Sequence, residues 1–202
     1  MTAFPVLLIL AYLSGALPWS VWLGRLLFRV DPRRQSDGNP GAANAFRAGG
    51  WRLGIAVLIL DFLKGFTPVF IAFWGLQLPD SQLFWVALMP TVGHAFSVFL
   101  GLRGGRALDT LFGVWTGLTL YEMPLVMGGA AIVSMRLFKD DIQRALTIPI
   151  VLIIALLIGD KPVWMVALAF AQLVVLTSKI IAFYRASDKL PTHADRRITL
   201  KT

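Results

Sequence analysis

Cysteine is absent from this 202-residue chain, and histidine occurs only twice. The first absence excludes disulfide bonds and thiolate metal sites. The two histidines are far apart in the sequence and have no partner at ligand spacing, so we expect no metal and no cofactor. Charged residues are also scarce, at 15% of the chain. This composition is not that of an ordinary soluble domain.

Apolar residues make up 57% of the chain and stand in runs comparable in length to a bilayer crossing. The sequence predicts an all-α fold, a polytopic integral membrane helical bundle with about seven transmembrane helices; five or six remain possible because the middle three segments are short. We place the transmembrane domain at 1–184 and a basic cytoplasmic tail at 185–202. The apolar segments fall at 4–28, 52–76, 83–102, 107–120, 124–138, 145–159 and 163–184.

The basic residues gather on one side of this arrangement. All of the 19 Lys and Arg residues except Lys64 and Lys161 fall on inside loops if residue 1 lies outside. This split follows the positive-inside rule and predicts an outer N-terminus and a cytoplasmic C-terminus. The net charge of +8 therefore indicates membrane topology and contact with anionic lipids rather than nucleic acid. No basic segment precedes the first apolar run, so residues 1–28 are expected to span the membrane rather than to form a removable signal peptide.

The most informative stretch is 93–110, where one apolar segment ends and the next begins. Polar groups are costly there unless they face water or a ligand. Backbone N–H groups beside guanidinium groups suit a phosphate or a carboxylate. The glycine pair is too short a motif for a Walker loop. The candidate residues here are His94, Arg103, Gly104, Gly105, Arg106 and Thr110. The histidine is either a base or phosphate donor, or a hydrogen-bonded packing residue.

A second polar constellation is the inside loop at 31–47, which is rich in glycine and asparagine. Asn39, Asn44 and Arg47 offer donors to an anion, and the arginine could bind it with two hydrogen bonds. The alternative is a solvated basic loop that faces the lipid surface.

Asp61 and Lys64 are charged residues inside the second apolar segment, at a spacing that places them on one helix face. We expect a buried pair that fixes the helix register. A charge relay in a small transporter is the lower-ranked alternative.

Four stretches carry a resemblance to a known family: Ser14 to Pro18, Gly38 to Arg47, Leu60 to Gly65, and Gly93 to Arg106. In this order they resemble the motifs of the bacterial acyl-phosphate:glycerol-3-phosphate acyltransferases, the membrane enzymes that begin phospholipid synthesis. The match in length, hydropathy and motif order extends over residues 1 to about 115. The last third is similar only in hydropathy.

The resemblance implies a seven-helix fold in the bacterial inner membrane with a cytoplasmic active site. The implied reaction moves a fatty acyl group from acyl phosphate to the 1-hydroxyl of glycerol 3-phosphate and gives lysophosphatidic acid, without acyl-CoA, acyl carrier protein or metal. The expected partners are these two substrates and membrane lipids, and the protein is expected to be a monomer. The implied catalytic residues are His94, Arg106 and Asn44. The implied substrate-binding residues are Asp37, Gly38, Asn39, Arg47, Arg103, Gly104, Gly105 and Thr110.

The chain departs from the family pattern in both anion-binding loops. Asp37 replaces a phosphate-contacting serine, and Ala43 replaces a threonine. Ala107 and Asp109 stand where the family has other small residues, and the family's third motif is barely visible around Tyr184. A carboxylate repels a phosphate dianion unless it is protonated or pairs with an arginine. The alternative function is therefore a non-catalytic paralogue that binds a phosphate or lipid, or an enzyme for a different polyol phosphate.

Overall fold

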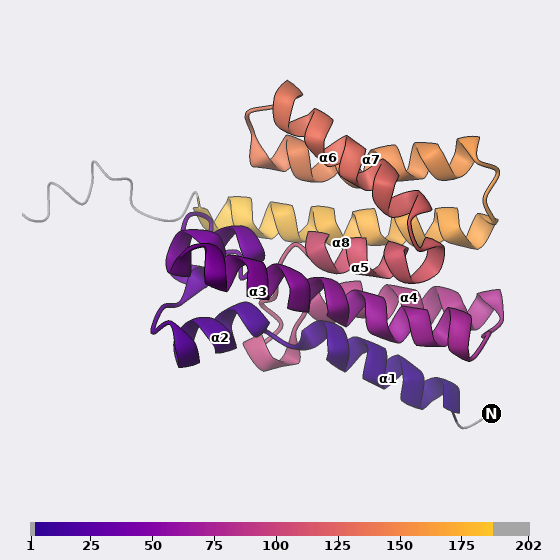
Figure 1. Cartoon of the computed structure of the whole chain (residues 1–202), viewed down its shortest axis with the longest axis horizontal. Helices are drawn as coiled ribbons and strands as arrows, with labels where there is room; N and C mark the ends of the chain where they lie inside the picture. The colour runs from indigo at the N-terminus through magenta and orange to yellow at the C-terminus, as the bar shows by residue number, and fades with distance from the viewer. Residues whose placement is uncertain (1–2, 188–202) are drawn as a thin grey trace, which may run out of the picture.

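The computed structural model describes residues 3–187, and within that range the chain forms helices and turns with no strand (Figure 1). The predicted all-α fold is confirmed. The α-helices are α1 Ala3–Ala16, α2 Trp19–Leu27, α3 Ala42–Phe70, α4 Asp80–Ala95, α5 Leu108–Thr119, α6 Glu122–Leu137, α7 Asp141–Ile158 and α8 Val163–Ser187. Short turns of 3-10 helix, η1 Pro32–Arg34 and η3 Val98–Leu100, lie in the loops, and the π-helical η2 Ile71–Gly75 extends α3.

Each of the seven apolar segments contains helix, but not every helix is long enough to span a membrane. Four spans pass by length and composition: 42–75, 80–100, 141–158 and 163–185. A fifth forms if α1 and α2, which are bent by 46° at Leu17 and Pro18, count as one broken span. With 12 and 16 residues, α5 and α6 fall short of a crossing. The predicted count of seven is therefore not confirmed.

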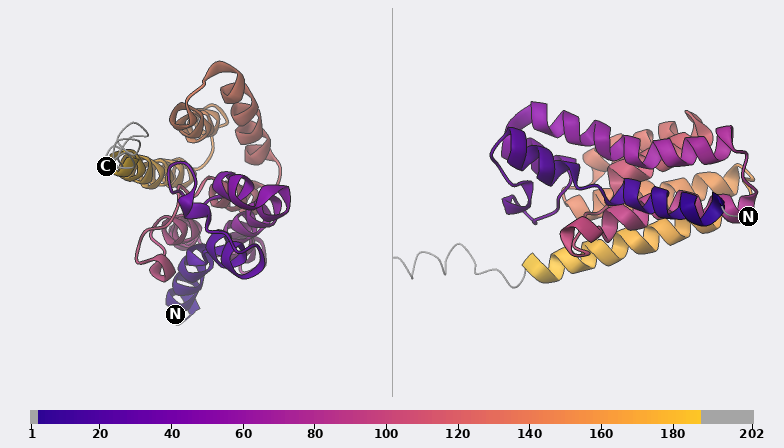
Figure 2. Two further views of the ribbon diagram at one scale, coloured as in Figure 1. Left: turned by 90° about the vertical axis from the view of Figure 1, so that its left-hand side faces the viewer. Right: turned by 90° about the horizontal axis from the view of Figure 1, so that it is seen from below.

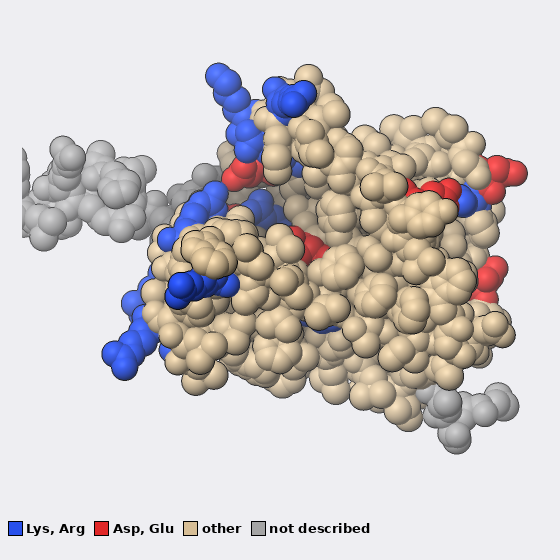
Figure 3. Space-filling model, in the orientation of Figure 1, with Lys and Arg blue, Asp and Glu red and all other residues tan. Residues whose placement is uncertain are grey.

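The surface of the bundle is that of a membrane protein. Large apolar side chains point outward along the helices, among them Leu125, Ile158 and Val163, which are 70%, 81% and 84% exposed. Water would not favour such a surface, whereas lipid chains cover it without cost. Figure 3 shows most of the visible Lys and Arg atoms gathered at one end of the molecule, with some acidic groups among them, whereas most of the charged atoms visible at the other end are acidic. Charge thus marks the two polar ends of an apolar bundle.

Close helix contacts hold the site's supporting elements together. A Cβ atom on Gly65 of α3 would collide with the carbonyl of Thr110, and one on Gly113 of α5 with the carbonyl of Phe62. Small residues at such crossings let helix backbones approach in a membrane, where packing drives association. Deeper in the core, the Trp115 ring donates from Nε1 to Gln172 at 2.8 Å. The α3–α5 contact therefore fixes where the segment leading into α5 lies relative to α3.

The hairpin of α6 and α7 stands to one side of the bundle (Figure 2). It packs against α5 and α8, and a cavity separates part of it from α3. Within α8, the helix continues through Ser187, slightly past the boundary predicted at 184. The remainder of the predicted tail, from 188 to 202, lies outside the described residues.

Candidate active site

The loop after α2 is shaped by an aspartate that gathers two arginines. The Asp31 carboxylate accepts hydrogen bonds from the backbone N–H and the side chain of Arg33, and it forms a 2.8 Å ion pair with Arg25. The hydrogen bond from the Arg33 side chain is the main cause that holds the pKa of Asp31 well below its ordinary value. The carboxylate therefore stays ionised and begins the short helix η1, which directs the chain back toward the bundle.

Asn44 holds the rest of this loop in place. Its side chain is almost completely buried, and Nδ2 lies 2.9 Å from Asp37 Oδ1 and 3.0 Å from the carbonyl of Asn39. Its Oδ1 accepts a 2.7 Å hydrogen bond from Arg47 Nη1. Both ends of the amide are thus occupied by protein groups. The geometry gives Asn44 a direct role in orienting its neighbours.

The segment between α4 and α5 is tied to that loop through backbone hydrogen bonds. The N–H of Gly105 donates to the carbonyl of His94 at 3.0 Å, and the N–H of Arg106 donates to Asn39 Oδ1 at 3.2 Å. A Cβ atom on Gly105 would lie 2.5 Å from His94 Nε2 and 2.8 Å from Asn39 Oδ1, closer than real Cβ atoms come. Glycine is therefore required where the two loops meet. The backbone N–H of Gly105, a residue predicted to bind substrate, is thus already engaged within the protein.

His94 is held by a partner on the following helix. Its Nδ1 lies 3.2 Å from the Thr110 hydroxyl, and both residues are buried. Within residues 3–187, Nε2 has no hydrogen-bonding partner, and the ring lies on the wall of the cavity described below. Nε2 is therefore the ring nitrogen available to a bound molecule.

Arg106 meets the unusual acidic residue of the first loop. Its Nη2 lies 2.9 Å from Asp37 Oδ2, and the arginine side chain is 14% exposed. The Asp37 carboxylate was expected to repel a phosphate unless it is protonated or pairs with an arginine, and here it pairs with Arg106. A ligand phosphate at Arg106 has to compete with this carboxylate.

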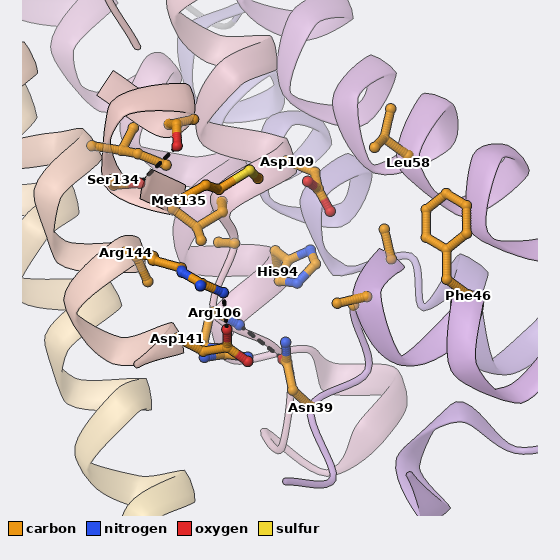
Figure 4. Close-up of a pocket in the computed structure, with 18 of the residues that line it drawn as sticks. Asn39, Phe46, Leu58, His94, Arg106, Asp109, Ser134, Met135, Asp141 and Arg144 are labelled. Carbon is orange, nitrogen blue, oxygen red and sulfur yellow. Dashed lines mark hydrogen bonds and ion pairs between the residues drawn. The ribbon is translucent and has the colours of Figure 1, made fainter. Parts of the chain in front are cut away.

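These groups converge on a cavity of about 390 Å³ between α3 and the α6–α7 hairpin (Figure 4). The charged side chains of one part are Arg47, Arg106, Arg144 and Asp141, whereas Asp109 lies apart from Arg106, Arg144 and Asp141, between Met135 and Leu58 (Figure 4). The other part is apolar and comes from Phe46, Leu58, Ala131, Met135 and Ile148. A long molecule with an anionic head and an apolar chain matches this division.

The predicted site residues take different places around the cavity. Asn39, Arg47, His94 and Arg106 line it. The remaining predicted residues are not part of this lining: Asp37, Gly38, Asn44, Arg103, Gly104, Gly105 and Thr110. Among them, Asp37 lines a neighbouring 150 Å³ cavity that shares Arg106 and Asp141.

Sequence reasoning missed Ser134, Asp141 and Arg144, which reach the cavity from α6 and α7. In the sequence, the arginine belongs to a basic inside loop at 136–144, where positive charge is accounted for by membrane topology. The i, i+3 spacing of Asp141 and Arg144 was the one local sign of a paired group. Only the fold brings the connection between α6 and α7 to the same cavity as the two predicted polar segments.

The predicted buried pair in α3 is present. Lys64 Nζ lies 2.8 Å from Asp61 Oδ1, and both side chains are nearly inaccessible. The ammonium also donates to the carbonyl of Leu17 at 3.0 Å, in the break between α1 and α2. The pair therefore braces the broken helix, and it lies on the wall of a pocket of only about 10 Å³.

Replacing Lys64 with methionine is expected to lower the free energy of unfolding by about 3–5 kcal/mol, because the Asp61 carboxylate is left buried without a counter-charge. The double variant D61N/K64M is expected to recover most of this loss. Thermal unfolding of the purified proteins in detergent measures both effects. A double variant as unstable as K64M would show that the pairing of the charges is not what matters.

Among residues 3–187, no group of three or more His, Asp or Glu side chains is arranged to hold a metal ion.

Comparison with known proteins decides the family. The family model described as glycerol-3-phosphate acyltransferase matches residues 5–189. The chain belongs to this family. A glycerol-3-phosphate acyltransferase of Anaeromyxobacter sp. (strain Fw109-5) is 46% identical over 113 residues, which are 54% of this chain and 56% of the relative. One of Syntrophotalea carbinolica is 39% identical over 140 residues, 69% of each chain.

The chain spans little more than half of the Anaeromyxobacter relative in this alignment. A solved structure extends the likeness further. The glycerol 3-phosphate form of PlsY (YgiH), an integral membrane glycerol 3-phosphate acyltransferase, matches with a TM-score of 0.81 and 28% identity. This match covers 88% of each chain. The family's integral membrane fold therefore extends into the last third, where the sequence resembled it only in hydropathy.

Proposed function

We propose that this protein is an acyltransferase that moves a fatty acyl group from acyl phosphate to the 1-hydroxyl of glycerol 3-phosphate and forms lysophosphatidic acid. The family and the relatives' shared name support the acceptor and the reaction. The observation that supports acyl phosphate as the donor is the lining of the cavity, which has arginines in one part and an apolar wall in another. An acyl phosphate has this same division between its anionic head and its chain.

The chemistry asks little of the protein beyond placing two substrates. Acyl phosphate is an activated mixed anhydride, so attack by the acceptor hydroxyl forms the ester bond and releases phosphate. Positioning and charge stabilisation supply most of the acceleration in such a case. Arg106 and Arg47 bind phosphate oxygens, and Asn39 and Asn44 hold the loop that presents them. His94 uses Nε2 to donate to a phosphate oxygen or to take the hydroxyl proton.

Asp37 moderates this site without abolishing it. Its carboxylate accepts hydrogen bonds from Asn44 and from the backbone N–H of Asn39 while it pairs with Arg106. It thus stabilises the loop and at the same time competes with substrate phosphate for Arg106. The non-catalytic alternative rested on this residue, on Asp109 and on the faint third motif, and the relatives named here give it no support.

Replacing Asp37 with serine is expected to lower KM for the phosphate substrate at Arg106 by about three- to tenfold, because the guanidinium no longer has an internal carboxylate partner. Steady-state kinetics of phosphate release measure this change. The matched control is Asp80→Ser at the first residue of α4, on the opposite end of the bundle, which should leave KM unchanged. An unchanged or higher KM in D37S would contradict the competition between Asp37 and substrate.

We further infer that the protein is a monomer in the bacterial inner membrane, with its arginine-rich end in the cytoplasm. The gathering of Lys and Arg at one end supports this orientation (Figure 3). The N-terminus then lies outside.

The donor is tested by offering the purified protein palmitoyl phosphate, palmitoyl-CoA or palmitoyl-acyl carrier protein together with glycerol 3-phosphate. We expect lysophosphatidic acid from palmitoyl phosphate alone, detected by mass spectrometry. Product from palmitoyl-CoA at a comparable rate would refute the proposed donor while leaving the acceptor in place.

A further inference from the structure

Arg144 is a cationic side chain in the cavity that neither the motifs nor the sequence patterns assigned to the site. It lies in the first turns of α7, and two protein acceptors fix its guanidinium. Nε donates to the carbonyl of Phe138 at 2.8 Å, and Nη1 donates to Asp141 Oδ1 at 3.1 Å. A guanidinium carries five N–H donors, so most of them are left for a ligand. The group is therefore pre-oriented and still able to bind an anion.

Asp141 places this arginine opposite Arg47 of α3. Its second oxygen lies 3.8 Å from Arg47 Nη2, so two guanidinium groups from separate elements converge on one carboxylate. Figure 4 shows Asp141 beside Arg144 and close to Arg106, at the charged part of the cavity. Convergent arginines are also how proteins bind phosphate. The carboxylate occupies the kind of position that a phosphate group would take.

The face of α7 continues from this charged corner into the apolar wall. Asp141, Arg144, Ala145 and Ile148 all line the cavity, at spacings that keep them on one side of the helix. Met135 of α6 lies on the same wall. A ligand phosphate held by Arg144 would thus have its attached chain directed along an apolar surface. Acyl phosphate has such a chain, and glycerol 3-phosphate does not.

We propose that Arg144, oriented by Asp141, binds the phosphate of the acyl donor and makes α7 a donor-specificity element of the site. This inference rests on the proposed function for the identity of the donor. Asp141 acts as a positioning residue that also weakens phosphate binding, since its negative charge lies where the ligand's charge must come. Substitution of the two residues should therefore change donor affinity in opposite directions.

The first test compares Arg144→Gln with Arg136→Gln, which removes the same charge from an exposed arginine at the end of α6, outside the cavity lining. The binding probe is dodecyl phosphate, titrated onto purified protein in nanodiscs, and glycerol 3-phosphate is titrated separately. For R144Q we expect the Kd for dodecyl phosphate to rise by about ten- to a hundredfold, the range for a lost charged hydrogen bond. The Kd for glycerol 3-phosphate and both values for R136Q should stay the same.

The second test compares Asp141→Asn with Asp140→Asn at the neighbouring position, which caps α7 by accepting from the N–H of Ile142. Asparagine keeps both side chains able to accept hydrogen bonds. D141N is expected to bind dodecyl phosphate several-fold more tightly than the unchanged protein, and D140N is expected to bind it equally. Thermal midpoints confirm that all four variants are folded.

Turnover separates this inference from the proposed function. In the active enzyme, R144Q should raise KM for palmitoyl phosphate and leave KM for glycerol 3-phosphate unchanged. If the unchanged protein has no acyltransferase activity, the proposed function fails, and the binding titrations alone decide the role of Arg144. Unchanged dodecyl phosphate binding in R144Q, or an equal loss for both phosphates, would overturn the inference.

Discussion

Replacement of Arg106 with alanine is expected to lower kcat/KM for acyl transfer by at least about a hundredfold, the usual loss when a preorganised charged donor is removed from a transition state. The first loop holds Arg106 at two points. Its backbone N–H donates to Asn39 Oδ1, and its side chain forms an ion pair with Asp37. The backbone hydrogen bond survives the substitution, so the loops keep their arrangement. The expected loss is therefore one of chemistry, with little change in the thermal midpoint.

The matched control is Arg52→Ala, which removes an exposed arginine of α3 that does not line the cavity. Its charge belongs to the same end of the molecule, so general effects of net charge are equal in the two variants. Near-normal turnover in R106A, or an equal loss in R52A, would contradict the catalytic role assigned to Arg106.

Replacement of Gly105 with alanine is expected to have a comparable effect on turnover through geometry alone. The added methyl group would press on His94 Nε2 and Asn39 Oδ1, and the hydrogen bond from Gly105 to the His94 carbonyl leaves the backbone little room to move. Either the imidazole or the Asn39 amide must shift, and misplacement by about 1 Å can cost a hundredfold in rate. Turnover and dodecyl phosphate binding of G105A measure the result.

The control for this variant is Gly129→Ala in the middle of α6, where an added Cβ atom meets nothing within 4 Å. Alanine there should leave activity unchanged and stabilise the helix slightly. Full activity in G105A would show that the junction of the two loops is looser than these contacts imply.

Hydropathy predicted much of the fold because membrane helices have to be long and apolar. All seven apolar segments contain helix, and the bend at Leu17 and Pro18 falls inside the first of them. The number of spans was not predictable in the same way. Segment length alone leaves α5 and α6 undecided, since short helices can be supported by their neighbours in a bundle.

The candidate site was predictable where motifs carry it and unpredictable where tertiary contacts do. The glycine-rich segment and the first loop meet, with Arg106 and Asn39 in direct contact. Asp37 was expected to disturb the site, and its pairing with Arg106 depends on a contact across many residues. Arg144 carried no motif, because its part in the cavity follows from how the α6–α7 hairpin packs. The roles of all these residues stay predictions.

Phosphate release from palmitoyl phosphate by the purified protein, measured with and without glycerol 3-phosphate, tests the central claim most directly. The account predicts release that depends on glycerol 3-phosphate and is matched by an equal amount of lysophosphatidic acid. No release from protein shown to be folded, or release that glycerol 3-phosphate does not affect, would contradict acyl transfer to this acceptor.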